Sequence, residues 1–283
     1  MSTKSEVVLH FNSIDELTNV VCHPKNIGNR YSTGKSWLGG DCETNADVYK
    51  LVEEGWPDGV EEILKLQAEM EIPEPISRRR KVKRGWDGND FDIHAVYSGN
   101  INKCWVKRTR QNKRGPQCVS VCVDIGANAG VSASRLFWRG ASALVIVDEL
   151  LKAGYKVEVI AFERCGGVFK SGSAPARLTV EVVVKDFDAP LELNSLVASC
   201  ALAGFYRVHT WKAEDSCPYK VSSGRGWAIN ETPQHLRGEM VIHNFHECYD
   251  KETSEKFINQ EFDRLVNKPV KKYQEDEETN QYY

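Results

Sequence analysis

The chain has 283 residues, of which 41% are hydrophobic and 27% charged, so it can bury one large core or two smaller ones. No apolar run reaches the roughly 18 residues that a membrane-spanning helix needs. The first residues also lack the long apolar stretch of a signal peptide. We therefore expect a cytoplasmic protein with no membrane partner. Nine cysteines, none spaced Cys-x-x-Cys, disfavour a disulfide framework and a structural zinc site.

The formal net charge of −3 conceals an uneven distribution of charge along the chain. Residues 77–115 carry twelve Lys and Arg against three Asp, so the remainder of the chain is acidic. Residues 271–283 form an acidic tail, which we expect to be disordered. Such a tail can compete with an anionic ligand for the basic surface.

Residues 1–75 predict an N-terminal α+β segment. A short strand is followed by a helix, because Ser13 and Glu16 have the spacing of a capping box. Gly55 then separates two further helices, and Pro57 suits the first turn of the second. The expected ranges are 7–11 for the strand, and 13–21, 43–54 and 57–70 for the helices.

Residues 76–116 predict a basic segment that connects the N-terminal part to the rest of the chain. The stretch 78–90 ends in Gly-Trp-Asp-Gly and is typical of a loop. Two short strands are expected, at 91–99 and 104–107.

An α/β pattern begins at residue 117 and extends to 270. The strand 118–124 is rich in Val and Cys, as a strand buried on both faces should be. Ser132 or Ser134 can cap the next helix, and Gly154 ends it. The pattern predicts a mostly parallel sheet flanked by helices. Further strands are expected at 157–163, 178–186, 205–211 and 239–247, and helices at 190–204 and 251–266.

The strand, loop and helix around the DIGAN stretch (124–128), with the later VIAF strand, resemble the von Willebrand factor A domain. In that family the first strand ends in Asp-x-Ser-x-Ser, and these side chains hold Mg²⁺ or Mn²⁺ through oxygen. By position, Asp124 matches the Asp, Gly126 the first Ser and Asn128 the second. Because Gly126 offers no side-chain ligand, the resemblance implies a degenerate site. Asp124 would be its metal ligand if Mg²⁺ binds at all, and Asp186 is a possible neighbour.

A second resemblance covers most of residues 7–215. The GWPDG stretch (55–59), Trp105 after a short SGN turn, and residues 139–159 are similar to an uncharacterised family of bacteriophage and plasmid proteins. This resemblance implies a phage-encoded protein of the host-cell cytoplasm. Von Willebrand A-like proteins of phages and bacteria often work beside MoxR-type AAA+ ATPases, so such an ATPase is an implied partner.

Two classes of function follow. In the first, the protein is a non-enzymatic adaptor, and the degenerate site holds another phage or host protein. Its expected contact residues are Asp124, Gly126, Asn128, Ser132 and Asp186.

In the second, it is a single-stranded nucleic-acid-binding accessory factor for phage transcription or replication. Lys and Arg neutralise phosphates, and flat aromatic rings stack on unpaired bases. A solvated basic loop, or a surface for an acidic protein, is the alternative explanation of the same residues. The candidate residues are Arg78, Arg79, Arg80, Lys81, Lys83, Arg84, Trp86, Lys103, Trp105, Lys107, Arg108 and Arg110.

Other motifs favour no specific chemistry. Residues 28–36 end in Gly-Lys-Ser but have five residues, not four, after Gly28, so they do not match a phosphate-binding loop. His243 and His246 would point to opposite faces of a strand, which disfavours joint metal binding. A metal-dependent hydrolase at the strand ends is a third hypothesis, for which the sequence offers no nucleophile or base.

Overall fold

The computed structural model describes residues 6–21, 33–70, 82–86, 88, 90–108, 118–167, 176–216, 228–229, 231–236, 240–243, 248–262 and 264. The chain divides into two compact units. The first, called the main unit, comprises Met1–Pro73 and Cys118–Tyr283, and the second, called the small unit, is Glu74–Gln117.

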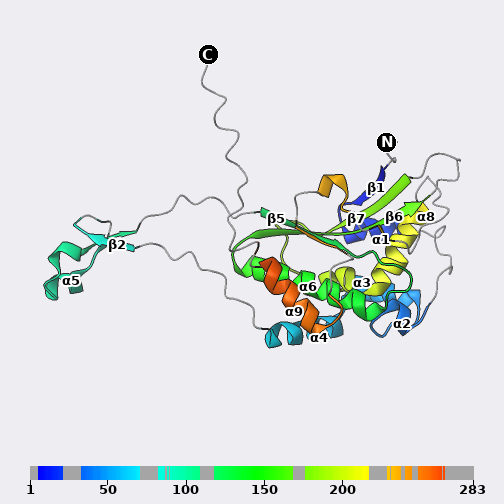
Figure 1. Cartoon of the computed structure of the whole chain (residues 1–283), viewed down its shortest axis with the longest axis horizontal. Helices are drawn as coiled ribbons and strands as arrows, with labels where there is room; N and C mark the ends of the chain where they lie inside the picture. Colours follow the sequence, from blue (N-terminus) through cyan, green and yellow to red (C-terminus); the bar gives the residue numbers. More distant parts are fainter. Residues whose placement is uncertain are drawn as a thin grey trace, which may run out of the picture. The chain divides into compact units, whose positions relative to one another are not determined.

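The main unit is built on a mostly parallel five-stranded sheet flanked by helices, as expected (Figure 1). The strand order is β1-β7-β6-β5-β8, and only the β6–β7 pair is antiparallel. β1 comes from residues 1–75, so this N-terminal segment shares the sheet of the α/β part. The strands are β1 (Glu6–Phe11), β5 (Cys118–Asp124), β6 (Lys156–Gly167), β7 (Ala176–Lys185) and β8 (Met240–Ile242).

Alternating side chains divide the sheet into two faces. Val121, Val123 and Val159 belong to the large hydrophobic core, whereas Cys122 and Phe162 belong to a second, small cluster. Since successive side chains of a strand point to opposite faces, β5 and β6 are buried on both sides. This explains the continuous apolar runs 121–123 in β5 and 159–162 in β6.

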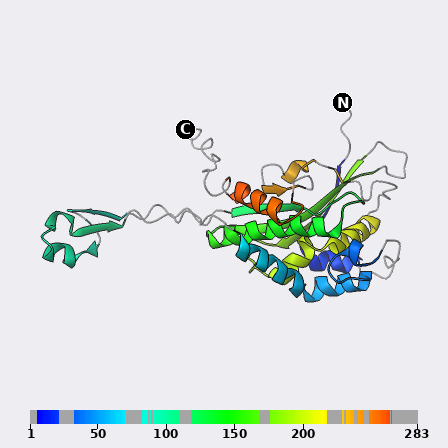
Figure 2. The ribbon, with the colours of Figure 1, turned by 60° about the horizontal axis from the view of Figure 1, so that its bottom comes forward.

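The helices of the main unit share the large core (Figures 1 and 2). α6 is the longest; Ser132 caps it by accepting a hydrogen bond from the Arg135 amide, and Gly154 follows its end with φ +88°. None of the described helices is long and apolar enough to cross a membrane. The core helices are α1 (Ile14–Val21), α3 (Asn45–Glu54), α4 (Pro57–Glu69), α6 (Ala133–Lys152), α7 (Leu193–Cys200), α8 (Trp211–Ser216) and α9 (Lys251–Phe262), and α2 (Lys35–Leu38) is a short helix beside them.

One predicted strand of the main unit is wrong. Residues 205–211 are helical: a π-helical turn, η3 (Phe205–Thr210), continues directly into α8. Every residue of η3 is buried, so its sequence lacks the polar positions by which an amphipathic helix is recognised. A short apolar run of this kind has the same pattern as a buried strand.

The other face of the sheet carries a polar cluster. The buried Glu181 of β7 lies between two half-exposed histidines, His10 of β1 and His235 of the short helix η4 (Gln234–Leu236). The carboxylate contacts His10 Nδ1 at 2.7 Å and His235 Nε2 at 2.6 Å. These contacts join β1 and η4 to β7.

The small unit has its own three-stranded antiparallel sheet, in the order β2-β4-β3. The expected loop 78–90 contains strand β2, and the expected strand 91–99 is mostly the helix α5. Residues 93–97 form a helix because of Asp92. Its carboxylate accepts hydrogen bonds from the amides of His94 and Ala95 and so starts the helix. The elements are β2 (Val82–Gly85), β3 (Asp90–Phe91), α5 (Ile93–Tyr97), η2 (Ile101–Lys103) and β4 (Trp105–Arg108).

The contact between α6 and α7 gives a test of the packing. A Cβ atom added to Gly140 would lie 2.2 Å from the Cys200 carbonyl oxygen, whereas one added to Gly130 would meet nothing within 4 Å. We expect Gly140→Ala to lower the free energy of unfolding by about 2 kcal/mol, because the backbone of α7 must move. Gly130→Ala is the control and should change it little. Equal midpoints of urea unfolding for the two variants would contradict this packing.

Candidate functional site

Asp124 ends β5, the strand between β6 and β8, and is only 1% exposed. Its Oδ1 accepts a hydrogen bond from the Gly126 amide at 3.0 Å. The Ile125 amide donates to the carbonyl oxygen of Phe162 at the end of the paired stretch of β6. The carboxylate therefore organises the loop that follows its own strand.

Arg139 of α6 supplies a buried positive charge beneath this loop. It is 5% exposed, and its Nη2 donates to the Gly126 carbonyl oxygen at 2.9 Å. Burial lowers the pKa of Arg139, and the charge of Asp124 opposes that shift. The charges of the guanidinium and the carboxylate therefore favour each other, and both groups form hydrogen bonds to Gly126.

The loop does not fit the hard-cation site of the von Willebrand factor A domain. A Cβ atom on Gly126 would lie 3.1 Å from Asp124 Oδ1 and 3.3 Å from Glu163 Cβ, so a serine there would be crowded. The Asn128 side-chain oxygen accepts a hydrogen bond from the Ala228 amide at 3.1 Å. The buried Arg139 adds a positive charge that repels a cation. Within the described ranges, no group of three or more His, Cys, Asp or Glu could hold a metal ion.

The other expected contact residues have different places. Ser132 caps α6 near the same loop. Asp186 is exposed and follows Lys185, which pairs with Val159 of β6, whereas Asp124 pairs with Phe162. Because β7 runs antiparallel to β6, Asp186 lies toward the opposite end of the sheet, and the structure does not bring it to Asp124.

Glu163 is a second buried acid at this end of the sheet, and it is 2% exposed. Its pKa is raised well above the usual value, first by burial, then by the charge of Glu214 and a hydrogen bond to it. A hydrogen bond to Thr210 acts in the opposite direction. Burial and the neighbouring Glu214 therefore favour the protonated form of Glu163.

Tyr206 connects this acid pair to the loop. Its hydroxyl donates to the Ala127 carbonyl oxygen at 2.8 Å, and burial followed by the charge of Glu163 raises its pKa. Tyr206, Thr210 and Glu214 are spaced four residues apart, which places them along one side of a helix. The sequence prediction missed them because it assigned residues 205–211 to a strand. Arg139 had a detectable signal, because it is a charged residue within the mostly apolar stretch Leu136–Val147 of α6.

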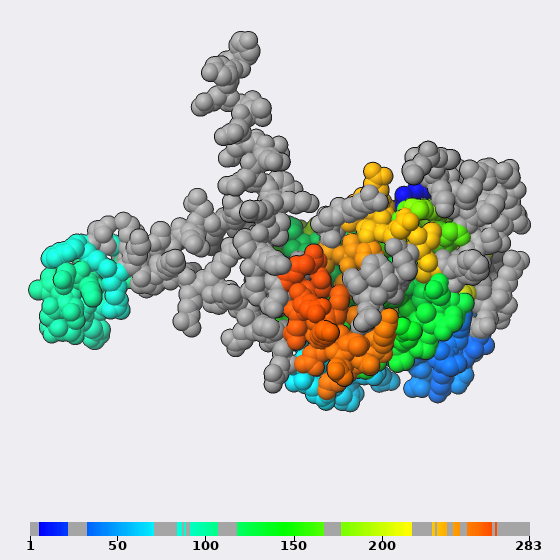
Figure 3. All heavy atoms as spheres, in the orientation of Figure 1, coloured from blue at the N-terminus to red at the C-terminus, as the bar shows by residue number. Residues whose placement is uncertain are grey.

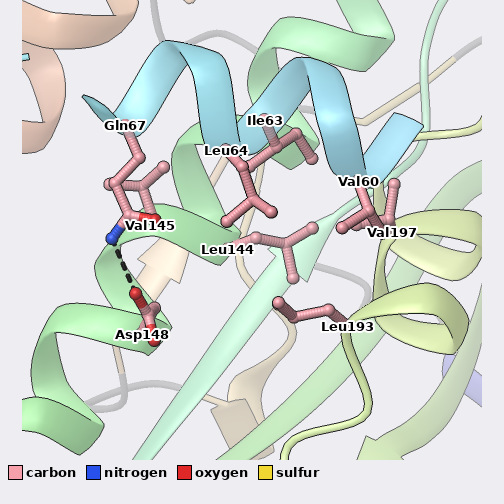
Figure 4. Close-up of a pocket in the computed structure, with 9 residues that line it drawn as sticks. All are labelled: Val60, Ile63, Leu64, Gln67, Leu144, Val145, Asp148, Leu193 and Val197. Atoms are coloured by element: carbon pink, nitrogen blue, oxygen red, sulfur yellow. Dashed lines mark hydrogen bonds between the residues drawn. The ribbon is translucent and has the colours of Figure 1, made fainter. Parts of the chain in front are cut away.

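A shallow groove of about 280 Å³ lies elsewhere on the main unit, between α4, α6 and α7 (Figure 4). Its lining is apolar except at one end, where Gln67 Nε2 donates to Asp148 Oδ2 at 2.6 Å. It contains no nucleophile, and the titratable group in its lining, Asp148, is also contacted by Lys152. The groove offers no chemistry of its own.

The small unit, drawn in cyan and teal in Figure 3, is the other candidate site. Six of the nine large apolar side chains that the described residues expose belong to it. The small unit therefore presents these side chains to solvent. The six are Trp86, Phe91, Ile93, Tyr97, Ile101 and Trp105.

The predicted nucleic-acid-binding residues are described to different extents. Arg84 makes an ion pair with Asp92 at 3.2 Å, Trp86 is 74% exposed, and Lys103 is exposed at the end of η2. Trp105 pairs with both Gly85 and Phe91 in the sheet. Lys83, Lys107 and Arg108 are placed by their backbone alone, and Arg78, Arg79, Arg80, Lys81 and Arg110 lie outside the described residues, as does His246.

Comparison with known proteins places the chain in a family. A family model described as a domain of unknown function (DUF7192) matches residues 2–273. The chain belongs to this family. The match agrees with the expected membership of an uncharacterised family and covers both units. No curated protein and no solved structure matches the chain.

The pairing of Asp124 with Arg139 predicts a strong energetic coupling. Replacing Arg139 by Met removes a positive charge that acts on the buried Asp124, so we expect a loss of about 3 kcal/mol or more in the free energy of unfolding. Adding Asp124→Asn should recover part of that loss, because the buried negative charge is then removed. A double-mutant cycle by urea unfolding measures the coupling, and additive losses would show that the two charges do not interact.

The buried Glu163 predicts a pH-dependent gain from Glu163→Gln. Because folding raises the pKa of Glu163, the group costs stability as the pH rises above 4.5, its usual value. Relative to the parent, the variant should gain up to about 1.4 kcal/mol per pH unit between pH 5 and the raised pKa. Glu53→Gln, at an exposed position of α3, controls for the loss of one charge. If unfolding of the parent and Glu163→Gln responded identically to pH, Glu163 would not be held protonated.

Proposed function

We propose that this protein binds single-stranded nucleic acid through the small unit. The observation that carries the proposal is the concentration of exposed aromatic and apolar side chains in the most basic part of the chain. A basic surface alone suits any polyanion. The exposed rings add a surface on which unpaired bases can stack. Such stacking does not depend on sequence, because every base has a flat aromatic face.

The basic residues and the aromatic residues contribute to binding in different ways. Lys and Arg displace counterions from phosphates, so binding weakens as salt rises, by roughly 0.7 log units per tenfold salt for each phosphate contacted on a single strand. Aromatic stacking contributes an affinity that depends much less on salt and does not depend on base sequence. The proposal therefore predicts tight, salt-sensitive binding with little sequence preference.

The adaptor role is the second candidate, and the rigidity of the Asp124 loop favours it. Residues 128–130 are exposed, while Arg139 and Tyr206 hold the preceding carbonyl groups in place. A rigid exposed loop suits contact with a partner protein without a metal ion. The phage or host partner, including an AAA+ ATPase, belongs to this proposal.

We also infer a distant relation to the von Willebrand factor A domain. Parallel strands β5 and β6 flank α6, β7 is antiparallel to β6, and β5 ends in Asp124. A phage origin and the host cytoplasm as the place of action follow from the sequence resemblance and belong to the same proposal.

The salt dependence of binding tests the main proposal. Replacing Arg78, Arg79 and Arg80 by Gln removes three charges, so the slope of log affinity against log salt should fall by about 2. Fluorescence anisotropy with a labelled oligothymidylate measures it. The matched control replaces Lys35, Lys50 and Lys65, three exposed lysines of the main unit, and should leave the slope unchanged. If both triple variants lose the same slope, or neither does, the small unit is not the binding surface.

A further inference from the structure

The small unit exposes aromatic rings that its own sheet does not cover. Phe91 of β3 and Trp105 of β4 meet edge to face with ring centroids 5.0 Å apart, and they remain 53% and 37% exposed. Trp86, just after β2, is 74% exposed, and Tyr97, at the end of α5, is 84% exposed. Exposed apolar surface of this kind marks an interaction site. The small unit therefore offers flat apolar faces to a ligand.

The same part of the chain is strongly basic. Residues 77–115 carry twelve Lys and Arg against three Asp, which gives them a formal charge of +9. Arg84 is 56% exposed even though its guanidinium lies 3.2 Å from the carboxylate of Asp92, and Lys103 is exposed at the end of η2. Three carboxylates cannot neutralise twelve positive charges, so this surface attracts an acidic ligand.

The acidic tail, residues 271–283, has the complementary pattern in its sequence. Residues 275–278 are Glu-Asp-Glu-Glu, the longest run of acidic residues in the chain. Tyr273 precedes this run, and Tyr282 and Tyr283 follow it. Negative charge beside flat rings is also what the proposed function requires of a nucleic acid. The acidic tail therefore shares both features by which the small unit would recognise a single strand.

Acidic pairs elsewhere in the main unit lack this pattern. Glu53 and Glu54 end α3, and Glu61 and Glu62 lie within α4, so both pairs are fixed in helices. A lysine of the same helix lies 3.8 Å from the carboxylate of Glu54 and 2.6 Å from that of Glu61. All four side chains are exposed. They match the acidic residues of the tail in number and charge but not in sequence pattern, which makes them a suitable control.

We propose that the acidic tail binds the basic and aromatic surface of the small unit and so competes with single-stranded nucleic acid. The inference rests on the proposed function and adds its regulation. A competitor in the same chain acts at an effective concentration of about 1 mM, so even weak binding of the tail lowers the apparent affinity for a ligand. Because charge supplies most of the attraction, salt weakens the competition.

The test removes the negative charge of the tail at positions beyond residue 273, where the family match ends. The tail variant is Glu275→Gln, Asp276→Asn, Glu277→Gln and Glu278→Gln. The control variant changes the net charge equally at the exposed positions of α3 and α4 and is Glu53→Gln, Glu54→Gln, Glu61→Gln and Glu62→Gln. Fluorescence anisotropy of the full chain with a labelled oligothymidylate measures the affinity at several salt concentrations.

At low salt we expect the tail variant to bind oligothymidylate about fivefold more tightly than the parent, because the competitor is lost. The difference should shrink as salt rises, so the tail variant should have the steeper salt slope. The control variant should change the affinity much less. A synthetic peptide of residues 271–283 should displace the oligonucleotide from the tail variant, and the same peptide with its four acidic residues neutralised should not. Circular dichroism of each variant confirms that it is folded.

The contrary outcomes are distinct. If neither the parent nor the tail variant binds oligothymidylate, the proposed function fails, and the inference fails with it. If both bind equally tightly at low salt, nucleic-acid binding stands and the competition by the tail is overturned. An equal gain in the tail variant and the control variant would also overturn it, because net charge alone would then set the affinity.

Discussion

The carboxyl end of the main sheet is organised around a buried charge. Asp124 is removed from water at the end of β5, and a carboxylate in such a place must be compensated. Arg139 provides the compensation from α6 and also holds the loop through the Gly126 carbonyl oxygen. The course of the loop depends on this arrangement, because Asp124 and Arg139 both form hydrogen bonds to Gly126.

The two candidate sites differ in whether their side chains are buried or exposed. At the sheet end, the acids, Tyr206 and Arg139 are buried and engaged with one another or with the loop backbone. In the small unit, which is rich in basic residues, the side chains of Trp86, Phe91 and Trp105 are exposed to solvent. Large exposed aromatic surface is retained when it has a ligand to bind. The first arrangement stabilises the fold, and the second suits recognition of a polyanion that has flat, apolar faces.

Sequence patterns predicted the β5–α6–β6 part of the fold because the Val-rich strand, the serine cap of the helix and Gly154 at its end all agree. They failed at residues 205–211, where complete burial removes the polar positions that separate helix from strand. That error also concealed Tyr206, Thr210 and Glu214, which come together only on a helix. In the small unit, Asp92 starts a helix in a stretch that otherwise resembles a strand. The sequence allowed Asp124 to be named as a candidate, but Arg139, which holds the Asp124 loop, depends on a tertiary contact that spacing does not encode.

The central claim is that ligand binding occurs at the small unit and not at the Asp124 loop. Hydrogen–deuterium exchange of the full chain, with and without an oligothymidylate, tests it directly by locating the amides that binding protects. The account predicts new protection within 82–108 and unchanged exchange in peptides that cover 124–131. Protection confined to 124–131, with none in the small unit, would contradict it.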